Sequence, residues 1–247
     1  MSQHFRLTRI TRLSSVRSLA GVGVVAGLAV IAGCNLDTST GTTGLAGPQG
    51  LIQFINAAPR YSTVNLNVDN TSAVTGEPYG AGSQVYVKAL SNPRQFTVRS
   101  GSDTTAVASG QLLVADRSTY TVILTQHAVG GNLLILPDTV SAPPANQVGI
   151  RIVNGSPSVG AVDLYVTTTD STLATPTATH VGFESGSVYV NVPAGTVRVR
   201  ITTAGTTTVL LDIDAGTLTP GQVRTILLVD ASGGGLPVSW LAVPDRG

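Results

Sequence analysis

Beyond residue 50, apolar and polar residues alternate along most of the chain. Residues 162–166 (Val-Asp-Leu-Tyr-Val) and 197–201 (Val-Arg-Val-Arg-Ile) carry an apolar side chain at every second position. A period of two is typical of a β-strand with one face in a core and the other in water. Turn residues separate these runs, and about seven runs fall within each stretch of roughly 90 residues, which predicts a two-sheet antiparallel sandwich.

The pattern occurs twice. Residues 52–59 (IQFINAAP) align with 150–157 (IRIVNGSP), and 64–68 (VNLNV) align with 162–166 (VDLYV) at the same offset. Later segments match with small insertions, and each copy ends in an apolar residue followed by Pro-Asp. An internal repeat of this size indicates two copies of one domain.

The sequence therefore predicts an all-β fold with two tandem antiparallel β-sandwich domains, immunoglobulin-like or transthyretin-like. The first copy is expected over residues 51–140 and the second over 148–247. Residues 141–147 (SAPPANQ) form a short Pro-bearing linker, too short and stiff to let the copies move far apart.

The first 33 residues have the layout of a signal peptide. Four arginines precede an apolar run, 19–32. As a helix this run reaches only about 21 Å, short of a hydrocarbon core of roughly 30 Å, so a transmembrane helix is the weaker interpretation. Residues 31–34 (Ile-Ala-Gly-Cys) resemble a bacterial lipobox.

We therefore expect cleavage between Gly33 and Cys34 and lipid on the Cys34 thiol. Two or more acyl chains, at about 0.8 kcal/mol per buried CH₂, make a stable membrane anchor. Residues 34–50 are rich in Gly and Thr and are expected to be a flexible tether. This anchor places the protein in the cell envelope. Asn35 follows the cysteine, which indicates the outer membrane if the organism is Gram-negative.

Charge excludes one class of partner. Four of the 14 basic residues precede Cys34, which leaves ten basic against 13 acidic residues in the mature chain. A mildly acidic body with scattered charges argues against nucleic-acid binding. Cys34 is the only cysteine in the sequence, so the domains must rely on their cores rather than on disulfides.

The strand patterns also carry a family resemblance. Residues 151–157 (RIVNGSP), 162–166 (VDLYV) and 192–196 (VPAGT) resemble the bacterial family called domain of unknown function 4397. The first copy departs from that pattern at Asn65 and at residues 91–94 (SNPR). The resemblance implies an exported β-sandwich module, often lipid-anchored and often tandem, and it implies no enzymatic activity.

Candidate catalytic and metal-binding residues are few. His127 and His180 stand singly in Thr- and Gly-rich surroundings, without a second ligand at metal-binding spacing, and are interpreted as solvated loop residues. No Ser lies in a Gly-x-Ser-x-Gly elbow. Asp212 and Asp214 suggest a calcium loop, but the alternation around them favours an outward-facing pair. We predict no catalytic residues, no metal and no cofactor.

Aromatic residues give weak binding candidates. Trp240 aligns with the apolar Leu133 of the first copy, which favours a core or half-buried position over sugar stacking. Tyr86, Tyr165 and Tyr189 are out of phase with neighbouring valines, and we take them as the best candidates for surface contacts.

The leading hypothesis is a non-enzymatic envelope lipoprotein that acts as an interaction or structural module on a lipid tether. Its partner would be an unknown envelope protein or polysaccharide. A carbohydrate- or cell-wall-binding module that uses exposed Tyr side chains is the alternative, and an envelope enzyme comes third. Strand phase adds one specific prediction, in which Arg198, Arg200, Asp212 and Asp214 share the outer face of one hairpin. One register pairs Arg200 with Asp212 and Arg198 with Asp214, and the other pairs Arg198 with Asp212.

Overall fold

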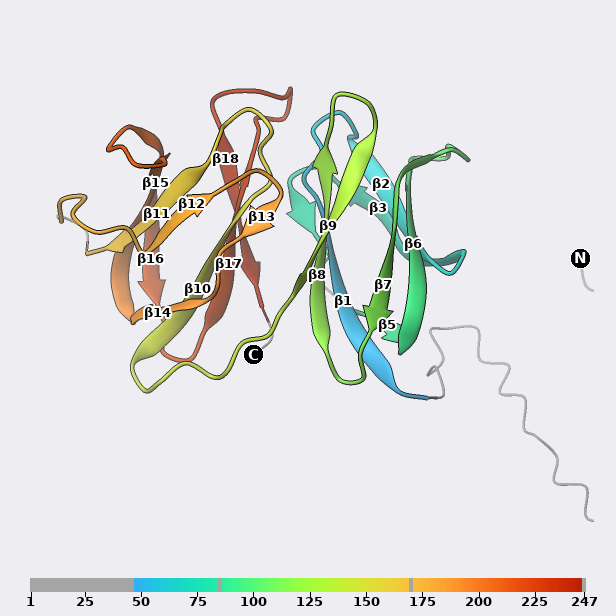
Figure 1. Cartoon of the computed structure of the whole chain (residues 1–247), viewed down its shortest axis with the longest axis horizontal. Helices are drawn as coiled ribbons and strands as arrows, with labels where there is room; N and C mark the ends of the chain where they lie inside the picture. The colour runs from blue at the N-terminus through green and yellow to red at the C-terminus, as the bar shows by residue number, and fades with distance from the viewer. Residues whose placement is uncertain (1–46, 84–85, 169–170, 246–247) are drawn as a thin grey trace, which may run out of the picture. The chain divides into compact units, whose positions relative to one another are not determined.

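The structure is a computed structural model that describes residues 47–83, 86–168 and 171–245. All of these lie in one compact unit, Gly44–Gly247. Every regular element among them is a β-strand, which confirms the all-β prediction (Figure 1). Within this part of the chain, no helix is long and apolar enough to cross a membrane. The predicted signal peptide and the lipidation site lie outside the described residues.

Each copy of the repeat contributes equivalent strands in the same order. Those of the first copy are β1 (Gln49–Asn56), β2 (Thr63–Val68), β3 (Thr71–Pro78), β4 (Ala81–Gly82), β5 (Val87–Leu90), β6 (Asn92–Ser100), β7 (Ala106–Val114), β8 (Thr119–Gln126) and β9 (Gly131–Pro137). Those of the second copy are β10 (Gln147–Asn154), β11 (Val162–Thr167), β12 (Ala178–Val181), β13 (Ser185–Gly186), β14 (Val190–Pro193), β15 (Gly195–Thr203), β16 (Val209–Leu218), β17 (Val223–Val229) and β18 (Ser239–Pro244).

The strands of each copy form two sheets. In the first copy, one sheet has the order β4-β1-β8-β9, with β5 also paired to β1, and the other has the order β3-β2-β6-β7. The second copy repeats this arrangement with β13-β10-β17-β18, where β14 also pairs with β10, and with β12-β11-β15-β16. We call the sheets containing β1 and β10 the inner sheets, because they contact each other, and the remaining two the outer sheets.

Most strand pairs are antiparallel, as the sequence predicts, but one pair in each copy is parallel. β1 runs parallel to β8, with Leu51 opposite Thr119, and β10 runs parallel to β17, with Gly149 opposite Val223. A parallel pair requires a long crossover connection. Here the chain makes this crossover through the outer sheet, and alternation within a single strand carries no signal of that topology.

Each sandwich has its own core. Ile52, Phe54, Leu66 and Phe96 are fully buried between the two sheets of the first copy. Ile150, Ile152, Leu164 and Val199 occupy corresponding places in the second copy. These side chains come from alternating positions, as the period of two requires.

A third apolar cluster lies between the inner sheets. Ile55, Ile123, Val153 and Leu227 are fully buried there, although they point away from the cores of their own sandwiches. The inner strands are therefore buried on both faces, and the expectation of one wet face per strand does not hold for them. Figure 1 shows the two sandwiches side by side, with the linker between them at the lower end of the view.

The hairpin of β15 and β16 adopts one of the two predicted registers. Arg200 lies opposite Asp212, and Arg198 lies opposite Asp214. The ion pair runs diagonally, because Arg198 donates Nε to Asp212 Oδ1 at 2.7 Å and Nη2 to Oδ2 at 2.5 Å. Both aspartates are exposed, which confirms their outward orientation.

Two details of that hairpin differ from the prediction. Strand phase predicts that Val209 faces inward with Leu211 and Ile213, but a register shift after Ile201 places it opposite Thr202, and it is 42% exposed. Arg200 is buried, because it donates Nη2 to Thr167 Oγ1 at 2.8 Å and to the Ser171 carbonyl at 2.6 Å. The segment after β11 thus covers part of the outer face of the β15–β16 hairpin, which was predicted to be solvated.

Candidate functional site

The two copies differ most at one open edge of the sandwich, where the last strand of the outer sheet approaches the last strand of the inner sheet. In the first copy these strands are β7 and β9, and they touch. A Cβ on Gly110 would lie at an ordinary contact distance, 3.7 Å, from Leu133 Cδ1 of β9. The contact between β7 and β9 closes this edge.

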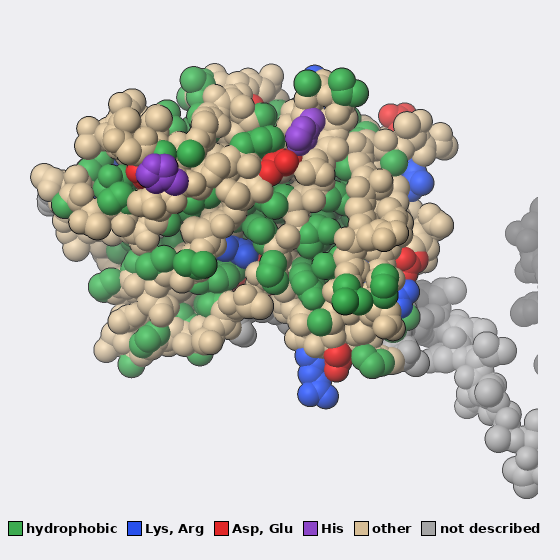
Figure 2. Space-filling model, viewed as in Figure 1, with side chains coloured by type: hydrophobic (Ala, Val, Ile, Leu, Met, Phe, Trp, Pro, Cys, Tyr) green, Lys and Arg blue, Asp and Glu red, His purple; other side chains and the backbone are tan. Residues whose placement is uncertain are grey.

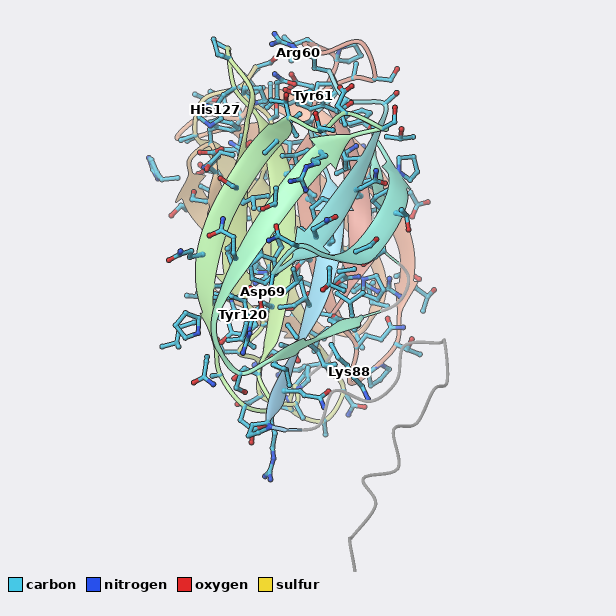
Figure 3. The ribbon with its side chains drawn as sticks, turned by 90° about the vertical axis from the view of Figure 1, so that its right-hand side faces the viewer. Arg60, Tyr61, Asp69, Lys88, Tyr120 and His127 are labelled. Carbon is cyan, nitrogen blue, oxygen red and sulfur yellow. The ribbon has the colours of Figure 1, made fainter. Side chains whose placement is uncertain are left out.

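Tyr120 completes the closure in the first copy. It is 8% exposed, its hydroxyl accepts a hydrogen bond from the Ala115 amide at 3.2 Å, and it donates to the Leu113 carbonyl at 3.5 Å. Figure 3 shows Tyr120 toward the lower end of this sandwich, away from Arg60, Tyr61 and His127. The ring plugs the core between β7 and β8.

In the second copy the equivalent edge is open. Arg224 takes the place of Tyr120, and Trp240 takes that of Leu133. A cleft of about 130 Å³ opens between β16 and β18. Its lining consists of Ile150, Val199, Ile213, Ala215, Thr217, Leu218, Arg224, Ile226, Trp240 and Ala242.

Arg224 is the one charged residue in this lining. It is half-buried, and its Nε donates to Gln222 Oε1 at 3.5 Å, a long and weak contact. Arg224 also lines an adjoining pocket of about 280 Å³, together with Pro143, Gln222 and Asp245. The guanidinium group therefore belongs to the mouth of the cleft, where it can receive an anion.

A second concentration of polar chemistry lies between the inner sheets. Arg151 is 3% exposed, and it donates Nη2 to Asp138 Oδ1 at 2.9 Å and Nε to Thr225 Oγ1 at 2.9 Å. Its guanidinium also stacks 4.5 Å above the ring of Tyr189. Asp245 completes this group, which we call the inter-sheet cluster: Thr121, Asp138, Arg151, Tyr189, Thr225 and Asp245.

Asp245 has an unusual environment in that cluster. Its side chain has no exposed area, and its Oδ2 accepts hydrogen bonds from Thr225 at 2.7 Å and Tyr189 at 3.0 Å. Its Oδ1 has no hydrogen-bond partner among the described residues and lies 3.8 Å from Arg151 Nη2. Burial raises the pKa of Asp245 to about 6.

Asp138 shares the same guanidinium group. Thr121 Oγ1 donates to both of its carboxylate oxygens at 2.9 Å. Burial raises the pKa of Asp138, although Arg151 and Thr121 oppose that shift. Two buried carboxyl groups thus face one arginine. A perturbed carboxyl group beside a pocket is found in active sites and also in structural ion-pair networks. However, a carboxyl group without exposed area cannot reach a substrate.

The sandwiches exchange further polar contacts at the opposite end of the inner sheets. Glu184 accepts hydrogen bonds from His127 Nε2 at 2.7 Å, from Asn132 Nδ2 at 3.1 Å and from Thr125 Oγ1. Burial raises the pKa of Glu184, but these hydrogen bonds outweigh it and lower the pKa below its usual value. His127 is therefore part of the contact between the copies rather than a free loop residue.

The structure places the predicted contact tyrosines apart. Tyr165 is 5% exposed on β11, where it lies opposite the buried Arg200, so its assignment as a surface contact is wrong. Tyr189 is half-buried in the inter-sheet cluster, and Tyr86 is half-buried before β5. Gly33 and Cys34 lie outside the described residues.

His180 and Trp240 lie where the sequence predicts them. His180 is exposed, and its backbone amide donates to Asp163 at 2.7 Å. Trp240 packs half-buried against the second core, as predicted. Within the described ranges, no group of His, Cys, Asp or Glu has the geometry to hold a metal ion.

Sequence reasoning missed Arg224 and Arg151. One signal was present in each case, because the internal alignment sets Arg224 against Tyr120 and Arg151 against Gln53. A charged residue in one copy at a position that is apolar or uncharged in the other marks a place where the copies have diverged.

Comparison with known proteins supports the family resemblance. The family described as Domain of unknown function (DUF4397) matches residues 50–165, which span the first copy and the first two strands of the second. No curated protein matches the chain.

Two solved structures resemble the chain only weakly. One is a family 26 carbohydrate-binding module of Eubacterium rectale in complex with maltoheptaose, with 10% identity and a TM-score of 0.26, covering 79% of this chain and 97% of that one. The other is a candidate adhesin from Bacteroides ovatus, with 9% identity and a TM-score of 0.24, covering 81% and 96%. Both are β proteins too distant to carry a functional argument.

Proposed function

We propose that this protein is a non-enzymatic lipoprotein of the cell envelope, tethered by lipid on Cys34, that binds a partner through the cleft of its second sandwich. The observation that carries the proposal is the difference between the copies. The same edge is plugged by Tyr120 in one sandwich and is open beside Trp240 in the other. Because both copies share one fold, the open edge is not a requirement of folding.

The lining of the cleft supports binding rather than catalysis. A binding site is concave and mostly apolar, with a few polar groups that orient the ligand, and this cleft has Arg224 and Thr217 in those roles. General acid–base catalysis needs a titrating side chain within reach of the substrate. The most perturbed acid, Asp245, has its side chain fully buried.

Burial also weakens the alternative of sugar binding by exposed tyrosines. A platform requires aromatic rings in a row on one face. Tyr165 is buried, and Tyr189 is occupied by Arg151 and Asp245. On the face shown in Figure 2, the few charged side chains are scattered, without one large charged patch.

The tether is tested by replacing the acylated residue. Cys34→Ser removes the thiol that would accept lipid, so we expect the protein to leave the membrane fraction and to lose palmitate label. Membrane association that survives both the substitution and a carbonate wash would show that residues 19–32 anchor the chain instead. In a Gram-negative organism, density separation of wild-type membranes should place the protein in the outer membrane.

Binding through the cleft is tested in cells with the full acylated chain. A photo-crosslinking amino acid at Thr217, on the exposed rim, should form an adduct that Arg224→Tyr removes. The same amino acid at Thr206, in the exposed β15–β16 turn, is the matched control. Equal adducts at both positions, or an adduct that persists after Arg224→Tyr, would argue against the cleft.

A further inference from the structure

The cleft of the second sandwich also indicates what kind of ligand it takes, an inference that rests on the function proposed above. Two positions distinguish it from the closed edge of the first copy: Arg224 for Tyr120 and Trp240 for Leu133. The first exchange removes a ring from the core and adds a cation at the same place. The ligand should therefore fill the space of the missing ring and carry a negative charge that pairs with the added cation.

We propose that the cleft binds a small organic anion, an apolar six-membered ring that carries a carboxylate. The ring would lie where Tyr120 lies in the first copy, against Trp240 and the surrounding aliphatic side chains. The carboxylate would lie at the mouth, paired with Arg224.

Size limits the ligand to about one ring. The cleft holds about 130 Å³, and an engineered apolar cavity of about 150 Å³ binds benzene. A long acyl chain needs several times that space at the spacing of buried CH₂ groups, and a single methyl group would leave most of it empty. A planar ring can also stack on Trp240, which adds about 0.5–1.5 kcal/mol to burial alone.

The polarity of the lining separates this ligand from a neutral sugar. A sugar ring carries a hydroxyl group on most of its carbons, and each buried hydroxyl needs a hydrogen-bond partner. Among the lining residues, Thr217, Arg224 and the indole N–H of Trp240 supply the polar groups, and the other seven residues are apolar. The cleft can satisfy a ligand with one polar end, but not one that is polar all round.

The charge of the site favours an anion. Arginine binds carboxylates through two parallel hydrogen bonds, and charge-assisted bonds are about twice as strong as neutral ones. The nearest acidic residue in the lining of the adjoining pocket is Asp245, whose carboxyl group is bonded to Thr225 and Tyr189. Among the described residues, Arg224 donates a side-chain hydrogen bond only through Nε, which leaves its terminal nitrogens for the ligand.

The protein contains its own reporter for this test. Trp240 is the only tryptophan in the sequence, so intrinsic tryptophan fluorescence reads the cleft alone. The mature full-length chain without lipid is titrated with phenylacetate, with the neutral analogue benzyl alcohol, and with a neutral hexasaccharide. We expect a saturable change with phenylacetate, a dissociation constant at least about tenfold higher for benzyl alcohol, and no change with the sugar.

Two variants of Arg224 separate charge from space. Arg224→Tyr restores the plug of the first copy and should abolish the response to phenylacetate. Arg224→Gln keeps the cleft open and should raise the dissociation constant of phenylacetate about tenfold, so that the anion and the neutral analogue bind alike. Arg198→Gln is the matched control, because it removes the same charge from the outer face of β15 and should change nothing.

The outcomes divide clearly. A wild-type chain that shows no saturable response, or that binds benzyl alcohol as tightly as phenylacetate, overturns the proposal. So does an Arg224→Gln variant that keeps the preference for the anion. If Thr217 still forms its cleft-dependent adduct in cells while phenylacetate does not bind, the proposed function stands and only the ligand class is wrong. Tight binding of the hexasaccharide would instead assign the cleft to a sugar.

Discussion

At the scale of single residues, the inter-sheet cluster is governed by a shortage of positive charge. Asp138 and Asp245 both lose all exposure of their side chains, and Arg151 is the one cation that both can reach. Two buried negative charges beside one positive charge are costly, because little water remains to solvate the excess. The carboxyl group with the poorer hydrogen bonding to Arg151 therefore holds its proton to higher pH, and that group is Asp245.

The pH dependence of stability follows from this. The folded-state pKa of Asp245, about 6, lies above its ordinary value of 3.8. Between those values the folded chain binds more protons than the unfolded chain, so its free energy of unfolding falls as pH rises. Asp245→Asn cannot ionise, and it should match wild type near pH 4 and exceed it by up to about 3 kcal/mol at pH 7.

Urea unfolding of both proteins from pH 4 to pH 7 measures this difference. The difference, rather than either curve alone, is the observable, because carboxyl groups with lowered pKa values, such as Glu184, act in the opposite direction. Parallel curves for the two proteins across that range would show that Asp245 titrates normally in the folded state.

Arg151 should be far more sensitive than a surface arginine. Arg151→Gln installs the residue found at the equivalent position of the first copy and leaves two buried carboxyl groups without a cation. We expect a loss of about 3–5 kcal/mol at pH 7, and a smaller loss at pH 5, where Asp245 has taken up its proton. Denaturant melts at both pH values test this.

The control for Arg151 is Arg198→Gln. Its ion pair with Asp212 leaves both side chains more than a third exposed, and such pairs contribute about 1 kcal/mol or less. Similar losses for the two variants would mean that the inter-sheet cluster is solvated.

At the scale of elements, the inner strands show what alternation can and cannot predict. The outer hairpin of β15 and β16 follows a period of two, and its register could be narrowed to two choices from the charges alone. In contrast, β8 contains the run 122–124 (Val-Ile-Leu) and β17 contains 226–229 (Ile-Leu-Leu-Val). Continuous apolar runs are typical of strands buried on both faces, so the sequence held a sign of a second buried face.

The candidate site was harder to predict than the fold. Alternation assigned Trp240 to the core, and it is there, but no pattern within one copy shows that the edge beside it is open. That property depends on whether β7 and β9 meet and whether Tyr120 fills the remaining gap. Both are packing relations between residues distant in sequence, visible only once the sheets are placed.

The third apolar cluster gives a direct test of the inner strands. Ile123 points out of its own sandwich, yet it is fully buried against the second copy. Ile123→Ala should therefore lower the free energy of unfolding by about 2–5 kcal/mol, as for a core residue. Val188, which is 79% exposed, is the control, and Val188→Ala should cost less than about 0.5 kcal/mol. A small effect at Ile123 would mean that the sandwiches separate in solution.

At the scale of the whole molecule, the two copies meet through equivalent surfaces. Both inner sheets contribute their own equivalent residues to the shared contact: Ile55 and Val153, Ile123 and Leu227. The acidic ends of the copies, Asp138 and Asp245, enter the same cluster and each accept a hydrogen bond from the equivalent Thr121 or Thr225. This is how a two-fold dimer pairs its subunits. The tandem chain thus resembles a dimer whose two halves are joined by the linker.

That internal symmetry predicts how the second copy behaves alone. A chain truncated to Val148–Gly247 carries a complete set of strands, so we expect a β-type circular dichroism spectrum and a cooperative melt. However, its inner sheet would expose Val153, Leu227, Val229 and Val243, an apolar surface that favours association. In a two-fold dimer of the second copy, Arg151 of each subunit would lie beside Asp245 of the other, because Asp245 is the equivalent of Asp138. The dimer would therefore contain this ion pair twice, whereas the tandem chain contains it once. We therefore expect a dimer with a melting temperature that rises with concentration, and a monomer after Arg151→Gln. Sedimentation equilibrium distinguishes these states, and a stable wild-type monomer would show that the inner sheets do not need each other.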